Sequence, residues 1–113
     1  MMKYKSKDVR KVTVIELSGN VMGGPDATML NDQLRKLIEG NKKKIVVDLK
    51  DVKFINSSGL GMLIGGLTTL RNSGGELKLA RASKKIETLL EMTKLTNVFD
   101  VHKSVNDAVD AFK

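Results

Sequence analysis

The sequence predicts a single α/β domain over residues 1–113, in which helices pack on a mainly parallel β-sheet. Two observations predict this fold class. Short strand-like segments alternate along the chain with longer segments in which apolar residues recur every three or four positions. No linker, low-complexity tract or internal repeat interrupts this alternation, and 113 residues suffice for one hydrophobic core. Strands separated by helices are joined by right-handed crossovers, which places the helices on a mainly parallel sheet.

The chain begins with two strand-like segments and an amphipathic helix. Residues 11–19 start as a strand with alternating faces, and residues 2–9 could pair with them as a hairpin. Gly23 and Gly24 then break the chain, and Pro25 suits the first turn of a helix. The apolar stripe of this helix ends at Gly40 and comprises Ala27, Leu30, Leu34, Leu37 and Ile38.

The middle of the chain predicts a buried strand and a second helix. Residues 45–49 form a short, nearly continuous apolar run, which is typical of a strand buried on both faces of a parallel sheet. After a polar turn, apolar residues recur at helical spacing until residues 72–75 end the helix. The stripe of this second helix comprises Leu60, Leu63, Ile64, Leu67 and Leu70.

The last part of the chain predicts two strands and two helices. Residues 76–80 have the pattern of a strand, and Ser83 can cap a third helix. Residues 98–101 predict a short edge strand. Ser104 lies three residues before Asp107, which is the spacing of a capping box at the start of a last helix.

The net charge of +7 at pH 7 invites comparison with nucleic-acid-binding proteins, because clustered Lys and Arg neutralise phosphates. The basic residues are instead spread over every segment, and the aromatic residues do not alternate with them as in a base-stacking surface. Lys3, Lys5 and Lys7 share one face of the first strand, where charge commonly protects a sheet edge. We therefore expect a solvated basic surface and no nucleic-acid partner. Attraction to an acidic protein surface stays open.

Composition also bears on the cellular setting. The sequence has no cysteine, which excludes disulfides and thiolate metal sites. No segment approaches the roughly 18 to 20 apolar residues that span a bilayer, and no apolar segment of a secretory signal follows the charged N-terminus. We expect a cytoplasmic protein without membrane insertion, and we expect neither a cofactor nor a metal.

A polar, glycine-rich turn within residues 54–61 places the hydroxyls of Ser57 and Ser58 at the N-terminus of the second helix. The free N–H groups of a first helical turn and the helix dipole favour negative charge, so a phosphate on either serine would be well accommodated. The turn is therefore a candidate switch. The alternative is that Ser58 only caps the helix, because serine is among the preferred N-cap residues.

The second helix is rich in glycine. An interior glycine costs roughly 1 kcal/mol relative to alanine, so these positions must gain from close approach of the backbone to the sheet or to a partner. Packing on the sheet does not explain an outward-facing glycine, which indicates a bare helix face that a partner can contact. On that face we expect Met62 beside Ser58, because residues four apart stack on one side of a helix. The glycines are Gly59, Gly61, Gly65 and Gly66.

Enzymatic sites find little support in the sequence. The glycines at the start of the second helix only partly match a dinucleotide-binding fingerprint, because its third glycine is missing. Ser58 as a nucleophile would need a base, and the single histidine, His102, lies near the C-terminus of a chain without a nucleophile elbow. Asp48 and Asp51 are expected to be solvated or capping acids. We therefore expect no enzymatic activity.

Three segments together resemble the STAS domain of bacterial anti-sigma factor antagonists. They are residues 45–63, which contain the serine turn, residues 74–79 and residues 95–99. The resemblance extends from about residue 3 to residue 112, and the serine turn is its most specific part. It implies a sheet of mixed direction with an antiparallel first hairpin at one edge, flanked by four helices.

The resemblance also implies a function, namely partner switching. The unmodified protein would bind an anti-sigma factor, a serine kinase with a histidine-kinase-like ATPase fold, and thereby release a sigma factor. Phosphorylation would break that complex, and a serine phosphatase would restore it. The phosphoserine of the family falls on Ser58, with Ser57 as the second candidate. The positions expected to contact the partner are Asn56, Ser57, Gly59, Gly61, Met62, Met22 and Asp26.

The chain departs from the family pattern at two places. Asn56 stands where the family has aspartate, which keeps the capacity to cap a turn but removes a carboxylate and puts kinase recognition in doubt. In residues 19–26 the usual glycine-glutamate-leucine-aspartate is absent, and Asp26 is a candidate for that aspartate. STAS-like domains also serve as scaffold subunits of lipid-transport ATPase complexes, and this role without phosphorylation is the alternative function.

Overall fold

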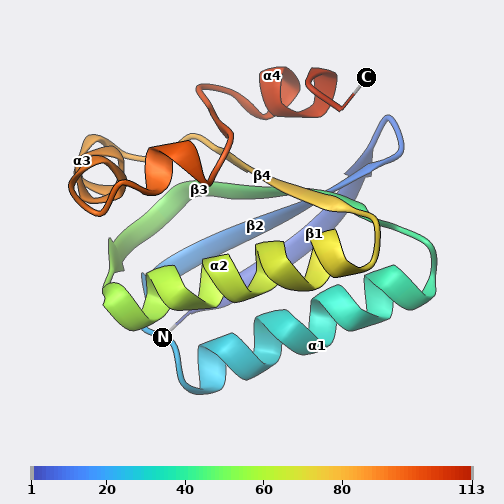
Figure 1. Ribbon diagram of the computed structural model, residues 1–113, viewed down its shortest axis with the longest axis horizontal. Coiled ribbons are helices and arrows are strands. Elements are labelled where there is room, and N and C mark those ends of the chain that lie inside the picture. The colour runs from blue at the N-terminus through green and yellow to red at the C-terminus, as the bar shows by residue number, and fades with distance from the viewer. Residues whose placement is uncertain (1, 113) are drawn as a thin grey trace.

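The computed structural model describes residues 2–112, so the first and last residues of the predicted 1–113 domain lie outside the described residues. Residues 2–112 contain one five-stranded sheet in the order β1-β2-β3-β4-β5 (Figure 1). β1 is antiparallel to β2, and the remaining neighbours are parallel. The strands are β1 (Lys3–Val9), β2 (Val12–Val21), β3 (Lys44–Ile55), β4 (Glu76–Ala80) and β5 (Val101–His102). The predicted mixed, mainly parallel sheet is confirmed.

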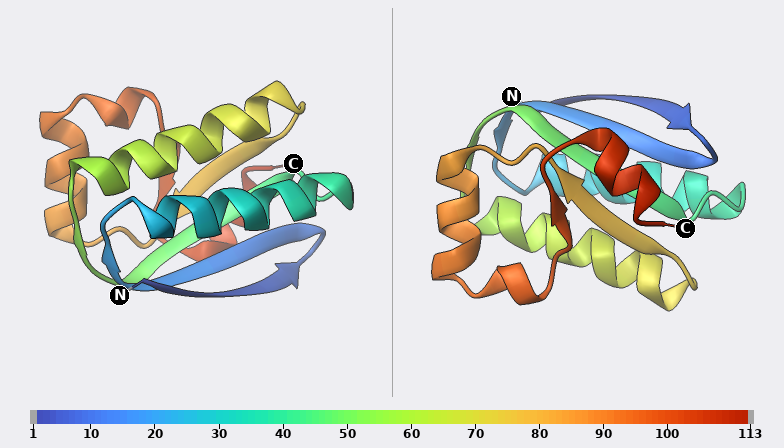
Figure 2. Two further views of the ribbon diagram at one scale, coloured as in Figure 1. Left: turned by 90° about the horizontal axis from the view of Figure 1, so that it is seen from below. Right: turned by 90° about the horizontal axis from the view of Figure 1, so that it is seen from above.

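Helices cover both faces of the sheet (Figure 2). α1 and α2 lie side by side on one face, because successive right-handed crossovers in one direction place their helices on the same side. α4 covers the opposite face, where its Ala108 and Val109 join Val14 and Val46 in a separate apolar cluster. The four α-helices of the described chain are α1 (Pro25–Glu39), α2 (Ser57–Asn72), α3 (Lys84–Met92) and α4 (Val105–Asp110), with a 3₁₀ turn at Leu95–Asn97. None of them is long and apolar enough to cross a membrane.

Several predicted element ends are confirmed. Pro25 occupies the first turn of α1, and Gly40 follows its last residue. The hydroxyl oxygen of Ser83 accepts a hydrogen bond from Ile86 N at 3.3 Å and caps α3. The hydroxyl oxygen of Ser104 accepts one from Asp107 N at 3.0 Å and caps α4. These caps satisfy backbone N–H groups that the first helical turn leaves free.

Other predicted boundaries were wrong. β3 does not end at residue 49 but continues to Ile55, because β2 pairs with it along residues 45–55 across two register shifts. The predicted polar turn therefore shrinks to Asn56, between the end of β3 and the start of α2. The edge strand predicted at residues 98–101 lies at Val101–His102 instead.

Asp48 was expected to be a solvated or capping acid. The solvated alternative was wrong, although Oδ1 of Asp48 does accept a local hydrogen bond from Lys50 N at 3.2 Å. The Asp48 side chain points to the face of β3 that carries Val46 and is 3% exposed. Arg81, which directly follows β4, forms an ion pair with it. Nε of Arg81 donates to Oδ1 of Asp48 at 3.0 Å, and Nη2 donates to Oδ2. The hydrogen bond to Asp48 raises the pKa of Arg81, so the guanidinium stays charged.

His102 is the last residue of β5. Its Nε2 lies 2.9 Å from Oδ2 of Asp100, and Nζ of Lys78 donates to the same oxygen at 2.7 Å. The Lys78 hydrogen bond is the main reason why the pKa of Asp100 is lowered, with a smaller contribution from His102. The histidine therefore lies beside an acid of its own sheet edge.

The turn between β1 and β2 holds two basic residues in the left-handed region. Arg10 has φ 49° and Lys11 has φ 70°, and Val9 pairs with Val12 across the turn. Two-residue hairpin turns of this kind favour Asn-Gly, because glycine and asparagine adopt positive φ readily. We expect the double substitution Arg10→Asn with Lys11→Gly to raise the free energy of unfolding by about 1 kcal/mol, measured by urea denaturation.

The same substitution removes the ion pair of Arg10 with Asp110, whose side chains are 52% and 47% exposed. Such an exposed pair contributes little stability, so it does not offset the relief of backbone strain. A variant less stable than the wild type would show that the left-handed turn is not strained in this chain.

Candidate functional site

The site begins where β3 passes into α2. Asn56 has extended backbone angles, φ −103° and ψ −178°, and its side-chain Oδ1 accepts a hydrogen bond from Gly59 N at 2.7 Å. Asn56 is therefore the N-cap, and the alternative that Ser58 caps the helix was wrong. β3 carries the chain in extended form to Ile55, and the helix starts directly after Asn56, two residues earlier than a cap at Ser58 would allow.

Ser57 and Ser58 are the first two residues of α2, and both are exposed. The Ser58 hydroxyl makes no hydrogen bond within residues 2–112. The backbone N–H groups of Ser57 and Ser58 belong to the first turn, which has no intrahelical acceptor for them. A phosphate on Ser58 would therefore reach free N–H groups and the positive end of the helix dipole.

The loop between β2 and α1 lies directly against this first turn. A Cβ on Gly23, which has φ +82°, would lie 2.7 Å from the Cβ of Ser58. A Cβ on Gly59 would overlap the carbonyl oxygen of Val21. Asn56 N also donates to that carbonyl at 3.3 Å. Both glycines are thus required for the loop and the helix to approach, which fixes the surroundings of Ser58.

Two predicted partner-contact residues lie in this loop. Met22 is 45% exposed, and its contact with a partner stays a prediction. Asp26 is half-buried in the first turn of α1, and its Oδ2 accepts a hydrogen bond from Met22 N at 3.2 Å. Asp26 therefore closes the loop that carries Met22, and this contact gives it a local structural role.

Sequence reasoning assigned no role to Phe54, which is 52% exposed two residues before the N-cap. Strand alternation could have indicated it, because Ile55 points inward and its neighbour in an extended chain must point outward. Together with Met22 it gives the described part of the chain two large exposed apolar side chains near the serine turn. Both side chains lie on segments that adjoin the turn with the two hydroxyls.

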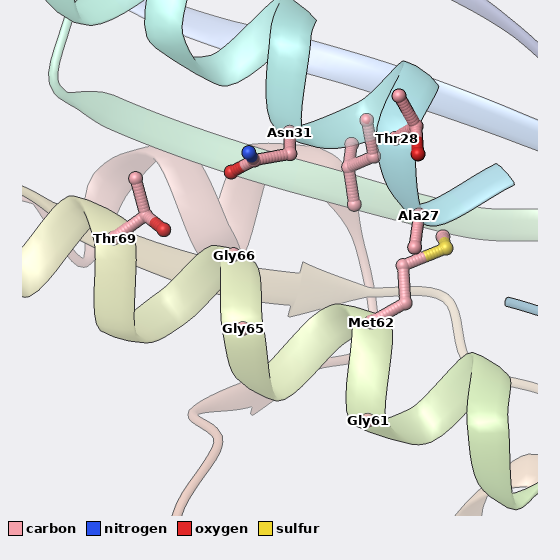
Figure 3. Close-up of a pocket in the computed structure, with 9 residues that line it drawn as sticks. Ala27, Thr28, Asn31, Gly61, Met62, Gly65, Gly66 and Thr69 are labelled. Atoms are coloured by element: carbon pink, nitrogen blue, oxygen red, sulfur yellow. The ribbon is translucent and has the colours of Figure 1, made fainter. Parts of the chain in front are cut away.

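The expectation that Met62 is exposed beside Ser58 was wrong, since its side chain is only 7% exposed. Figure 3 shows the Met62 side chain directed from α2 toward Ala27 of α1. Gly61 and Gly65 do face outward, and a Cβ at either position would meet no atom within 4 Å. They line a groove of about 460 Å³ between α1 and α2. The bare helix face is confirmed, but Met62 is buried and lines the groove between α1 and α2.

The arrangement offers a hydroxyl for modification and no neighbouring base. His102 pairs with Asp100 rather than with Ser58. Within the described residues, no group of three or more acidic or histidine side chains is placed to hold a metal ion. This geometry would accommodate a negatively charged group on Ser58 at the start of α2.

Comparisons with known proteins agree with this geometry. A model of the STAS domain matches residues 3–108. The chain is 30% identical to the anti-sigma-B factor antagonist of Bacillus subtilis (strain 168) over 89 residues, 76% of this chain and 81% of that protein. A crystal structure of a putative anti-sigma factor antagonist from Thermotoga maritima superimposes with a TM-score of 0.85 at 22% identity, covering 96% of this chain and 92% of that one.

A second solved structure is described as the Bacillus cell fate determinant SpoIIAA in the phosphorylated form. It superimposes with a TM-score of 0.73 at 18% identity, covering 98% of this chain and 100% of that one. At these identities the two structures show a shared fold.

Proposed function

This chain belongs to the STAS domain family, and from that premise we propose that it is an anti-sigma factor antagonist that works by partner switching. The unmodified form binds an anti-sigma factor, a serine kinase with a histidine-kinase-like ATPase fold, and the sigma factor is released. Phosphorylation of Ser58 breaks the complex, and a serine phosphatase restores it. The protein acts in the cytoplasm and catalyses no reaction itself.

One observation carries the proposal. Ser58 presents an exposed hydroxyl at the start of α2 that has no partner among residues 2–112, and the exposed side chains of Met22 and Phe54 lie on the segments that flank this turn. A kinase can reach this hydroxyl, and a protein partner can cover the apolar side chains at the same time. The names of the curated relatives support the same role, because the Bacillus subtilis protein is an anti-sigma-B factor antagonist.

The structure bears on how the phosphate would act. A phosphoserine carries about 1.5 to 2 negative charges at pH 7. In the free protein, the N–H groups and dipole of α2 would stabilise this charge. In the complex, an apolar partner surface would have to cover it, and burial of an unpaired charge is strongly unfavourable. Phosphorylation should therefore leave the fold intact and weaken the complex.

Asn56 in place of the family's aspartate is compatible with this mechanism. The side-chain oxygen that caps Gly59 N is present in both residue types, so the geometry of the first turn does not depend on the carboxylate. Asparagine removes a negative charge two residues before Ser58. The phosphorylated state should therefore suffer less repulsion here than with aspartate.

Phosphorylation of the purified protein tests the proposal. The unmodified chain is purified from its native host, and a co-purifying kinase is identified by mass spectrometry and then produced separately. We expect incubation with that kinase, ATP and Mg²⁺ to add one phosphate, located on Ser58 by peptide mass spectrometry. Ser57→Ala should accept the phosphate, and Ser58→Ala should not.

Two outcomes would contradict the proposal. A phosphate on another residue would refute the assignment of Ser58. A stable complex with the kinase in which this protein is never phosphorylated when ATP is added would favour a scaffold role.

A further inference from the structure

We propose a second binding site, for a small ligand that carries phosphate groups, at the end of the domain opposite Ser58. Figure 1 shows that the β1–β2 turn, the α1–β3 loop and the α2–β4 loop lie together at one end, whereas α2 begins at the other. These three connections enclose a hollow of about 490 Å³. Its lining includes Lys11 of the β1–β2 turn, Lys43 directly before β3 and Lys44, the first residue of β3.

The charges in this hollow are not neutralised within the protein. Other basic residues at this end are paired: Lys42 donates to Asp8 at 2.7 Å, which lowers the pKa of Asp8, and Arg10 contacts Asp110 at 2.9 Å. The acid of the hollow, Glu76, is engaged by Arg71 at 3.1 Å.

By contrast, the ammonium groups of Lys11, Lys43 and Lys44 form no ion pair within residues 2–112. Three lysines without an ion-pair partner among the described residues therefore line one hollow, and its single acid, Glu76, is already paired with Arg71. The mutual repulsion of the three lysines would be relieved by a bound anion.

The backbone around the hollow is held in unusual conformations. Lys11, Asn41 and Gly74 all line it, and their φ angles are 70°, 62° and 82°. Left-handed residues other than glycine are disfavoured, and they gather at functional sites. Lys11 in particular occupies a hairpin position where glycine is the favoured residue. A lysine there places a charge beside the hollow at the expense of backbone stability.

The chemistry of the lining indicates a small phosphorylated molecule. Lysine binds phosphate as a point charge, and the amide of Asn41 adds hydrogen-bonding capacity. Phe112 contributes an apolar wall. The volume is within the roughly 300 to 1,000 Å³ of ligand pockets. A nucleic-acid surface would need basic and aromatic residues along an extended track, whereas Phe112 is the single aromatic residue of this hollow.

Calorimetric titration with inorganic tripolyphosphate tests the site. We expect binding that weakens as salt rises, and that weakens about tenfold in the double variant Lys43→Gln with Lys44→Gln. The matched control is Lys84→Gln with Lys85→Gln, which removes the same charge from exposed positions of α3 and should bind like the wild type. Ser58→Asp should also bind normally, because it alters the other end of the domain.

The turn variant Arg10→Asn with Lys11→Gly gives a second test. It is expected to be more stable than the wild type, so weaker binding by this variant cannot result from unfolding. Binding to vesicles with and without phosphatidic acid identifies the source of the phosphate. Vesicle binding that is weakened by Lys43→Gln with Lys44→Gln would assign the phosphate to a lipid headgroup. Binding of tripolyphosphate without binding to these vesicles would assign a soluble ligand.

Two results would overturn the proposal. Equal weakening in the α3 control would show attraction to net charge rather than to this hollow. Failure of the wild type to bind either tripolyphosphate or phosphatidic acid would show that the hollow takes no phosphate.

Discussion

The Ser58→Asp variant is expected to lose capture of the anti-sigma factor, with a dissociation constant weakened about 100-fold or more. An unpaired carboxylate beneath an apolar partner surface costs several kcal/mol, and each 1.4 kcal/mol corresponds to about tenfold in affinity. In the free protein the same carboxylate lies in the first turn of α2, where negative charge is favourable. The free energy of unfolding should therefore change by less than about 0.5 kcal/mol.

Binding measurements with the purified kinase, together with urea denaturation, check both parts of this prediction. Ser58→Ala should bind whether or not ATP is supplied, because it cannot be phosphorylated. Ser6→Asp is the matched control: Ser6 is an exposed serine of β1, and the same charge there should leave capture unchanged. Capture by Ser58→Asp at wild-type affinity would refute the switch.

The spacing of apolar residues predicted the fold because, in each helix and strand, those residues fall on the side that is buried. Leu30 and Leu34 fall on one side of α1 and are buried, and Ile15 and Val14 alternate between the two faces of β2. Sequential strands joined by helices leave few topologies. The residue patterns predicted the first hairpin and the four helices, the resemblance implied the same arrangement, and both features are confirmed.

The errors at the site have a shared cause, which is contact between segments distant in sequence. The pairing of β2 with β3 extends the strand and makes Asn56 the cap instead of Ser58. The neighbouring α1 covers Met62, although helical spacing alone places it beside Ser58. The spacing of residues within one helix or strand does not show which other helix or strand packs against it. The roles proposed for the site residues remain predictions.

The largest effect on stability is expected from the buried ion pair between Asp48 and Arg81. Arg81→Met should lower the free energy of unfolding by about 3 kcal/mol, because it leaves the Asp48 carboxylate without a counter-charge. We take the low end of the usual range of about 3 to 5 kcal/mol, since the Arg81 side chain is 34% exposed and water can partly solvate the carboxylate. Urea denaturation of the two proteins measures the difference.

A double-mutant cycle separates the pair from its surroundings. Asp48→Leu with Arg81→Met should be more stable than Arg81→Met alone, because no charge is then left unpaired in the apolar face that Val46 shares with α4. Asp51→Asn is the control, since Asp51 is an exposed acid of the same strand and should change stability by less than about 0.5 kcal/mol. Equal stability of Arg81→Met and the wild type would show that the Asp48 side chain does not depend on Arg81 as a partner. In that case burial of its carboxylate would place no constraint on the sequence at position 81.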